Sequence, residues 1–356
     1  MRKHLLIGAL SLLLPFVFSS CATSVGYLWK QGSYLIKYSS GAKNISSMLR
    51  KESTPSDLKE FLRSVERIKQ FAVDDIGLKD NRNYTRYKAL DRDYLVNVVQ
   101  AAKPLSFTSY EWKYPLFGKL PYKGYYVPSD AKAEAERLKG QGYDVIVRKV
   151  DAFSTLGFFR DPVYSFMRGY TPYELASLII HEQTHATLFL KGQDQFNEEM
   201  ATYVGDRGAL EYLASVYGKG SAEYEQAVAE QADNRLFLKF IVQLRAALSV
   251  VYASDLPLNE KLAKKKATIR RYMSIFETEY VPQFHTDSYR SLKKLPINNA
   301  YLMLFGLYTQ EIPLLARYDE LYCGNNLKDF MQKMEQLSRQ PGRMIDKIKK
   351  QIAAGS

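Results

Sequence analysis

Cysteine and tryptophan are scarce in this sequence, with two residues of each among 356. The cysteines are Cys21 and Cys323, and they lie far apart in the chain. So few cysteines exclude a small disulfide-rich scaffold, in which several bridges replace a large apolar core. Hydrophobic residues make up 46% of the chain, and this content and length allow a sizeable core. We therefore expect packing alone to stabilise the fold.

The sequence also lacks internal repeats, low-complexity linkers and arginine-rich blocks. Its formal net charge is +12, but Lys and Arg are distributed along the chain. The basic run NEKLAKKKATIRRYM at 259–273 fits a solvated helix face or a contact with anionic lipid head groups. No basic stretch is interleaved with aromatic residues in the manner of a nucleic-acid-binding groove. We therefore expect no nucleic-acid partner.

The N-terminus carries an apolar run that is too short to span a bilayer comfortably. Arg2 and Lys3 precede this run, which covers residues 5–18, and two small serines and Cys21 follow it. A positive segment, an apolar segment and small residues in this order form an export signal. Small residues before a cysteine resemble a bacterial lipobox, in which the cysteine receives the lipid anchor.

We predict that residues 1–20 are a signal peptide and that Cys21 is lipidated. Removal of 20 of the 356 residues leaves 336, and loss of Arg2 and Lys3 lowers the net charge from +12 to +10. With Cys21 acylated, no intrachain disulfide is possible. The predicted location is the bacterial cell envelope, on the outer membrane and facing the periplasm or the surface; plain secretion or an uncleaved anchor are the alternatives. The rest is divided into a lipidated N-terminus with a first helix at 21–50 and a single domain at 51–352.

Apolar spacing and helix-start signals predict a predominantly helical α+β protein. A small β region is expected between residues 84 and 153, with strands in YLVNVVQAA, LSFTSYEW and YDVIVRKVDAF. Helices on both sides of a segregated β region are typical of the α+β class. The predicted helices lie at 22–50 with a break near residue 41, at 57–75 and 131–140, from Thr171 to a stop at Lys191-Gly192, and at 198–217, 222–252, 258–279, 299–320 and 325–352.

Two of the four histidines lie in one segment, LIIHEQTHATLFL at 178–190. His181 and His185 are four residues apart, so on a helix they face the same side. Two imidazoles and a carboxylate suit a catalytic zinc ion that keeps one position for water. Zinc lowers the pKa of that water, and Glu182 is placed to take its proton and pass it to a leaving amine. The alternative is a surface or core helix with two spare histidines; within this apolar run, the histidines are costly to bury without partners.

The third ligand is expected from the next helix, after a turn at 191–196. Glu198 and Glu199 are the candidates, and only one can face the ion because adjacent helical positions are about 100° apart. The run NEEMATY at 197–203 resembles the N-E-x-x-A-x-[YF] segment that supplies the glutamate ligand in gluzincin peptidases, which favours Glu198. Glu199 is then a solvated acid in the first helical turn or a ligand of the substrate's free α-amine.

The chain as a whole resembles the bacterial putative aminopeptidase lipoprotein family, which is of gluzincin type. The resemblance implies a thermolysin-like zinc-peptidase core, a peptide substrate, Zn2+ as cofactor and a membrane anchor at Cys21. Gln183 and Thr184 depart from the more common Leu-Ala of the family, and Lys113 and Lys119 stand where it often has cysteines. Besides the zinc motif, the matching segments are Gly26-Tyr27, Phe71-Ala72, Leu90–Arg92, Tyr122–Tyr125, Gly142–Val145, Phe153–Phe159, Asp161–Val163, Phe196–Glu198 and Asn298–Ala300, with Tyr308 and Pro313.

The family resemblance also suggests residues that contact substrate. In gluzincins an edge strand upstream of the zinc helix pairs with the substrate backbone, and FSTLGFF at 153–159 takes this place. Ser154, Thr155, Leu156 and Gly157 are the candidates, since glycine admits a close backbone approach; an ordinary bulged strand is the alternative. Tyr308 is the candidate donor to the developing oxyanion, against the alternative of one packed tyrosine among 27.

These observations together predict zinc-dependent hydrolysis of peptide bonds by a membrane-anchored lipoprotein that acts as an aminopeptidase. A zinc endopeptidase is the alternative within the enzyme class. A non-catalytic, zinc-containing lipoprotein that binds envelope components is the alternative outside it, and the presence of all four chemical residues counts against this.

Overall fold

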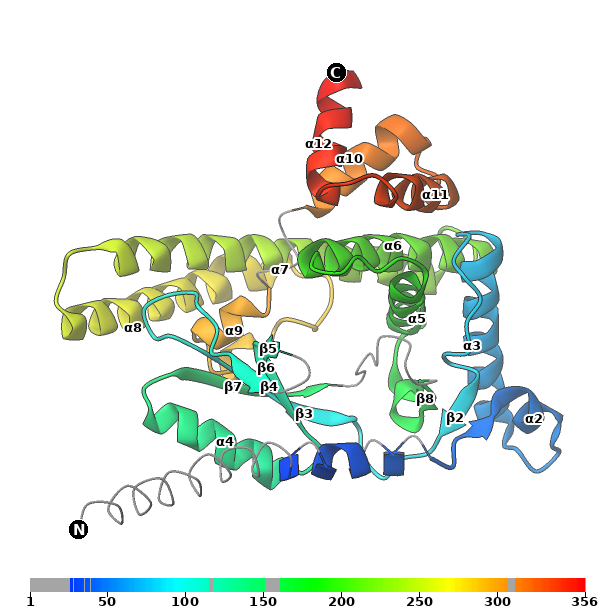
Figure 1. The fold of residues 1–356 in the computed structure, drawn as a ribbon, viewed down its shortest axis with the longest axis horizontal. Coiled ribbons are helices and arrows are strands. Elements are labelled where there is room, and N and C mark those ends of the chain that lie inside the picture. The colour runs from blue at the N-terminus through cyan, green and yellow to red at the C-terminus, as the bar shows by residue number, and fades with distance from the viewer. Residues whose placement is uncertain are drawn as a thin grey trace, which may run out of the picture.

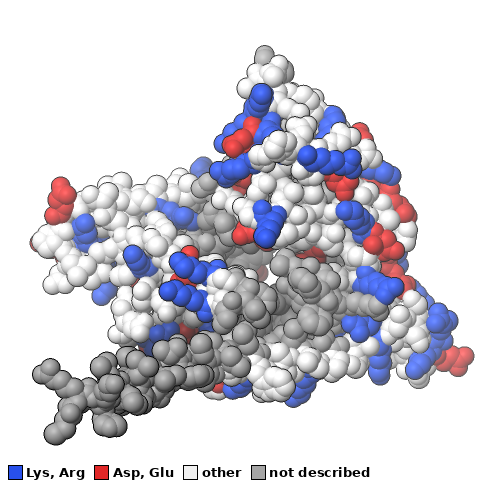
Figure 2. Space-filling view, viewed as in Figure 1, with Lys and Arg blue, Asp and Glu red and all other residues white. Residues whose placement is uncertain are grey.

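The computed structural model of the protein describes residues 26–27, 29–34, 36–38, 40–114, 118–150, 161–305 and 311–355. The fold is α+β and predominantly helical, as predicted, with small sheets that lie among the helices (Figure 1). Lys and Arg side chains are dispersed over the face seen in Figure 2, with acidic side chains between them.

The N-terminal part surrounds a small mixed sheet. Described residues between 26 and 38 are helical, and Gly41 turns the chain with a φ of 69°, which agrees with the predicted break. α2 (Ile45–Arg50) and α3 (Ser56–Asp74) follow. β2 (Arg86–Lys88) pairs antiparallel with β1 (Lys43–Asn44) and parallel with β8 (Val163–Tyr164).

A second sheet has β3 (Val96–Ala102) at its centre, antiparallel to both β6 (Tyr122–Tyr125) and β7 (Asp144–Val150). One face carries Val99 and Val145 and packs on α4 (Pro128–Gly140). The other face, with Val96 and Val98, joins the large core that also contains the histidine-bearing helix. This sheet therefore separates α4 from the helical body (Figure 1).

The strand predicted in LSFTSYEW is wrong for residues 105–111. This segment contains only an isolated bridge between Ser109 and Ala102, although its aromatic and β-branched residues resemble a strand. The chain enters a strand only at β4 (Trp112–Tyr114), which pairs with β5 (Gly118–Leu120). The composition of residues 105–111 therefore favoured a strand, although these residues lie outside the hydrogen-bonded strands of the sheet.

The helical body begins with α5 (Pro172–Thr187) and α6 (Asp194–Val216), which pack closely on each other. α7 (Ala222–Ala253), α8 (Leu258–Ile275) and the short α9 (Asn299–Met303) enclose an aromatic core that includes Phe237, Phe240 and Phe276. Among the helices that are described, α7 alone is long and apolar enough to cross a membrane. Its buried aromatic side chains serve the protein core.

The last three helices, α10 (Ile312–Cys323), α11 (Leu327–Ser338) and α12 (Met344–Gly355), lie against α6 (Figure 1). The single helix predicted at 325–352 is wrong, because Gly342 has a φ of 98° between α11 and α12. The helix predicted at 299–320 is also wrong as one element, since α9 ends at Met303 and α10 begins at Ile312. The α-helix predicted to reach residue 279 ends at Ile275 and continues as a π-helical turn.

Candidate metal centre

The helix that carries both histidines begins as its sequence predicts. The Thr171 side chain accepts a hydrogen bond from the backbone N–H of Glu174, and the Glu174 carboxylate accepts one from the backbone N–H of Thr171. This reciprocal pair satisfies two of the unpaired N–H groups at the start of α5, and Pro172 follows as the first helical residue. The predicted end of this helix at Lys191-Gly192 is wrong, because α5 ends at Thr187.

Asn197 explains how α5 connects to α6. Its fully buried side chain accepts a hydrogen bond from the backbone N–H of Leu190 at 2.9 Å and donates one to the Leu190 carbonyl at 2.8 Å. The loop is therefore fixed to the second turn of a helix that already begins at Asp194, earlier than predicted. Glu198 is the next residue, so this bond pair also sets the position of its carboxylate.

His181, His185 and Glu198 converge at the crossing of α5 and α6. The two histidine Nε2 atoms are 3.1 Å apart, and the Glu198 oxygens lie 3.3 Å from Nε2 of His185 and 3.7 Å from Nε2 of His181. Ligand atoms around a tetrahedral ion with bonds of about 2.0–2.1 Å are separated by roughly 3.3 Å. These three residues could therefore bind a metal ion, and Glu198, rather than Glu199, is the carboxylate that joins the histidines.

Two glycines on α6 allow this close helix packing. A Cβ on Gly205 would lie 3.0 Å from the Ser177 carbonyl oxygen and 3.1 Å from the Cβ of His181. A Cβ on Gly208 would lie 2.6 Å from a methyl carbon of Ile76. Because Gly205 has no Cβ, α6 can approach the backbone of α5 directly beside the first histidine, and the missing Cβ of Gly208 leaves room for the side chains of Ile76 and Ile180.

The electrostatics of the group favour an ionised carboxylate. Burial opposes ionisation of Glu198, but its close polar interactions with His181 and His185 outweigh this effect and hold the pKa of the carboxyl well below its usual range. Burial lowers the pKa of His181, but Glu198 and Glu182 more than compensate, so this pKa is raised. A carboxylate that stays ionised and two convergent imidazoles suit a divalent cation.

A half-buried acid, Asp206, lies within electrostatic reach of His181. Asp206 on α6 accepts hydrogen bonds from the hydroxyls of Tyr173 and Ser177, each at 3.0 Å. Its pKa is raised by burial, and its charge contributes to the raised pKa of His181. The sequence analysis missed Asp206, for which the spacing to the histidines gives no signal.

The Nδ1 of His185 is buried and has no hydrogen-bond partner within the described part of the chain.

Glu199 points away from the histidines and is fully buried. Its carboxylate accepts a hydrogen bond from the Gln195 side chain at 3.1 Å and another from the backbone N–H of Glu311. The interpretation of Glu199 as a solvated acid is therefore wrong. Its assignment to the substrate's α-amine stays a prediction, and the observed contacts tie α6 to the start of α10.

Glu182 lies next to His181 on α5 and is half-buried. Tyr84, from the β region, is buried close to it: burial, followed by the charge of Glu182, raises the pKa of this phenol. The other residues that the sequence analysis predicted to contact substrate, to donate to the oxyanion or to carry lipid lie outside the described residues. They are Ser154, Thr155, Leu156, Gly157, Tyr308 and Cys21.

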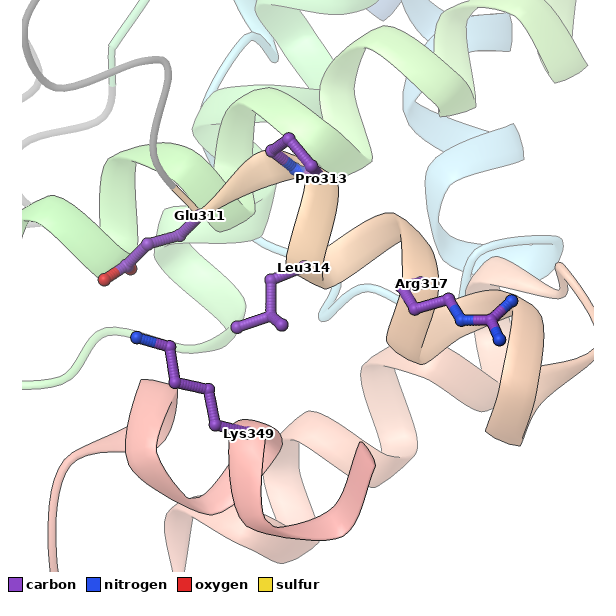
Figure 3. A pocket seen from close by; sticks show the side chains of 5 residues that line it. All are labelled: Glu311, Pro313, Leu314, Arg317 and Lys349. Carbon is purple, nitrogen blue, oxygen red and sulfur yellow. The ribbon is translucent and has the colours of Figure 1, made fainter. Parts of the chain in front are cut away.

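A separate pocket of about 500 Å3 lies between α10 and α12. Figure 3 shows the carboxylate of Glu311 and the ammonium group of Lys349 ending near each other, with the Leu314 side chain to one side of both. Neither histidine nor Glu198 lines this pocket. It is therefore distinct from the candidate metal centre.

The fold and this group of side chains define an α+β protein in which two packed helices form a candidate metal centre. The chain belongs to the family described as Putative aminopeptidase, whose model matches residues 26–347. Neither a curated protein nor a solved structure matches the chain.

Proposed function

We propose that this protein is a zinc-dependent aminopeptidase with a gluzincin-type core. The observation that carries the proposal is the convergence of two imidazole nitrogens and one carboxylate, with Glu182 beside them on the same helix. Two nitrogens and one oxygen are a common ligand set of catalytic zinc. Membership of the aminopeptidase family supports peptide bonds as the substrate.

The roles of the side chains follow from their positions. A zinc ion held by His181, His185 and Glu198 would supply a Lewis acid and lower the pKa of a water molecule. Glu182 accepts a proton from water on its carboxylate and returns it to the nitrogen of the leaving amine. Asp206 accepts hydrogen bonds from the hydroxyls of Tyr173 and Ser177, and these bonds fix the side chains of α5 that precede His181.

Further parts of the proposal concern residues outside the described ranges. Thr155, Leu156 and Gly157 would bind the substrate backbone, and Tyr308 would donate to the oxyanion. Cys21 would carry a lipid that anchors the enzyme in the bacterial cell envelope, on the outer membrane.

The purified protein tests this proposal through its metal content and its activity. We expect about one zinc per chain by mass spectrometry, and hydrolysis of peptides with a free α-amine but not of N-blocked peptides. Glu182→Gln should keep the zinc and lose activity by about 10²- to 10⁴-fold, since it removes the acid–base group alone. Glu198→Gln should lose the zinc as well.

Glu225→Gln is the matched control, because this exposed glutamate lies in the first turn of α7 and should alter neither measurement. A chain without stoichiometric metal, or full activity in Glu182→Gln, would contradict the proposal. Cleavage of N-blocked peptides at equal rates would instead identify an endopeptidase.

A further inference from the structure

The pocket between α10 and α12 is lined by side chains of both charges and by apolar ones. Glu311 lies at the start of α10, Arg317 follows on the same helix, and Lys349 lies on α12. Pro313 and Leu314 supply the apolar part of the lining. The volume of about 500 Å3 is within the range of pockets that bind small molecules, roughly 300–1,000 Å3. The pocket can therefore hold a small molecule with charged and apolar parts.

Glu311 carries a buried oxygen atom that no donor reaches. Its Oε2 has no hydrogen-bond partner within the described part of the chain. Burial raises the pKa of its carboxyl, and the charges of Glu199 and Asp346 add to the rise, whereas those of Arg343 and Lys349 oppose it. A buried carboxylate oxygen without a donor is costly, because the water that it loses is not replaced. A ligand with a positively charged donor would therefore stabilise the ionised form of this carboxyl.

Lys349 lies close to this carboxylate without being paired to it. Figure 3 shows the two groups ending near each other, and the charge of Lys349 favours the ionised form of Glu311. Within the described ranges, however, Lys349 forms neither a hydrogen bond nor an ion pair. Arg317 is paired with Glu320 at 2.8 Å and points away from both groups (Figure 3). Glu311 and Lys349 are therefore the charges that a ligand can use.

Both walls of the pocket are fixed to the helical body. The backbone N–H of Glu311 donates a hydrogen bond to the fully buried carboxylate of Glu199 on α6. On the other wall, the backbone N–H of Met344 at the start of α12 donates to the Gln193 side chain at 2.8 Å. Ile348, which precedes Lys349, is fully buried. The fold therefore shapes the pocket before any ligand binds.

We propose that this pocket binds a free α-amino acid with an apolar side chain. The α-ammonium group donates to the carboxylate of Glu311, and the α-carboxylate accepts from the ammonium group of Lys349. One carbon atom joins these two groups in an α-amino acid, so the molecule fits two opposite charges that end near each other. Hydrogen bonds between charged groups are shorter and stronger than neutral ones. The apolar side chain packs on Pro313 and Leu314.

The inference goes beyond the proposed function, because it concerns a second site. Neither histidine nor Glu198 lines the pocket, so an amino acid binds there whether or not the protein cleaves peptides. An aminopeptidase releases molecules of this class, and the pocket would then meet the product of the proposed reaction.

Calorimetric titration of the purified protein with L-leucine tests the site. We expect one leucine per chain, and much weaker binding of N-acetyl-leucine, which lacks the ammonium group, and of leucine amide, which lacks the carboxylate. Glu311→Gln and Lys349→Gln should each weaken leucine binding by about 10- to 100-fold, since each removes one charge-assisted hydrogen bond. Glycine should bind more weakly than leucine, because it lacks the apolar side chain.

Lys350→Gln is the matched control, because it removes the same charge from the next residue of α12, which is exposed and does not line the pocket. It should leave leucine binding unchanged. Glu198→Gln separates the pocket from the metal centre, where a released amino acid could also bind. This variant should bind leucine as tightly as the wild-type protein does.

The inference would be overturned if the wild-type protein bound no leucine, if it bound leucine amide and N-acetyl-leucine as tightly as leucine, or if Glu311→Gln left the affinity unchanged. Loss of binding in Glu198→Gln would place leucine at the metal centre and overturn the inference as well. Peptide hydrolysis is measured separately. A protein that binds leucine in the pocket but cleaves no peptide loses only the proposed activity, and a peptidase that binds no leucine loses only the pocket.

Discussion

At the scale of single residues, the candidate centre depends on side chains that bind no metal themselves. Asn197 is the clearest case, since both hydrogen bonds of its side chain go to the backbone of Leu190. Those bonds fix the loop between α5 and α6, and Glu198 is adjacent in the chain. The position of the Glu198 carboxylate is therefore determined by Asn197, whose own side chain binds the loop and not the histidines.

Asn197→Ala should reduce both stability and zinc affinity. The substitution leaves an N–H and a carbonyl of a half-buried loop unpaired, which costs about 1–3 kcal/mol. Urea unfolding should show this loss, and competition with a chelator should show weaker zinc binding. Asn326→Ala is the control: it removes the N-cap of α11, costs about 1 kcal/mol and should leave zinc affinity unchanged. Unaltered zinc affinity in Asn197→Ala would show that the loop does not position Glu198.

Sequence reasoning at this scale succeeded where the relation between residues is local. The spacing of His181 and His185 predicted their shared face because four residues make one helical turn. The motif at 197–203 selected Glu198, which the structure brings to the histidines. Asp206 and the contact from Glu199 to Glu311 were missed, because each joins segments whose distance in the sequence carries no periodic signal.

At the scale of elements, the crossing of α5 and α6 is the feature that makes the centre. α5 supplies both histidines and the proposed acid–base group, and α6 supplies Glu198, the proposed third ligand. Their separation is set where Gly205 contacts the backbone at Ser177. Sequence patterns predicted both helices and the start of α5 at its Thr171 cap, but not the end of α5 or the start of α6, because the bonds of the loop between them decide these and lie outside the apolar repeat.

Gly205→Ala should disturb the centre through the helix crossing. Its Cβ would meet a backbone oxygen and the Cβ of His181, neither of which can move without moving α5. We expect a loss of about 1–3 kcal/mol in unfolding free energy and a weaker zinc affinity. Gly140→Ala is the control, since a Cβ there meets nothing within 4 Å, and it should be neutral or slightly stabilising. Normal zinc binding by Gly205→Ala would mean that the crossing tolerates a wider separation.

At the scale of the whole molecule, the exposed side chains of the first described residues bear on the proposed attachment to a membrane. The first described residues are helical and expose Trp29 by 80% and Ile36 by 64%. Cys21 precedes this segment by only a few residues. Large apolar side chains beside the proposed lipid anchor suit contact with a bilayer surface, where they would leave water. The α+β class could be predicted from the sequence because predicted helices and strands occur in separate blocks. The packing of α10–α12 on α6 could not be predicted, since the hydrogen bond from Glu311 to Glu199 joins segments that are far apart in the sequence.

Labelling with a clickable fatty acid during growth tests the anchor directly. The thiol of Cys21 follows the predicted signal, whereas that of Cys323 is buried in the fold and has its pKa raised, by burial first, to about 11. We expect the wild-type protein and Cys323→Ser to incorporate the label equally and Cys21→Ser to lose it. Because an unprocessed signal could keep Cys21→Ser in the membrane, incorporation of label is a better measure than fractionation. Label on Cys21→Ser, or none on the wild-type protein, would rule out lipidation at this residue and leave the apolar N-terminal segment as the remaining means of attachment.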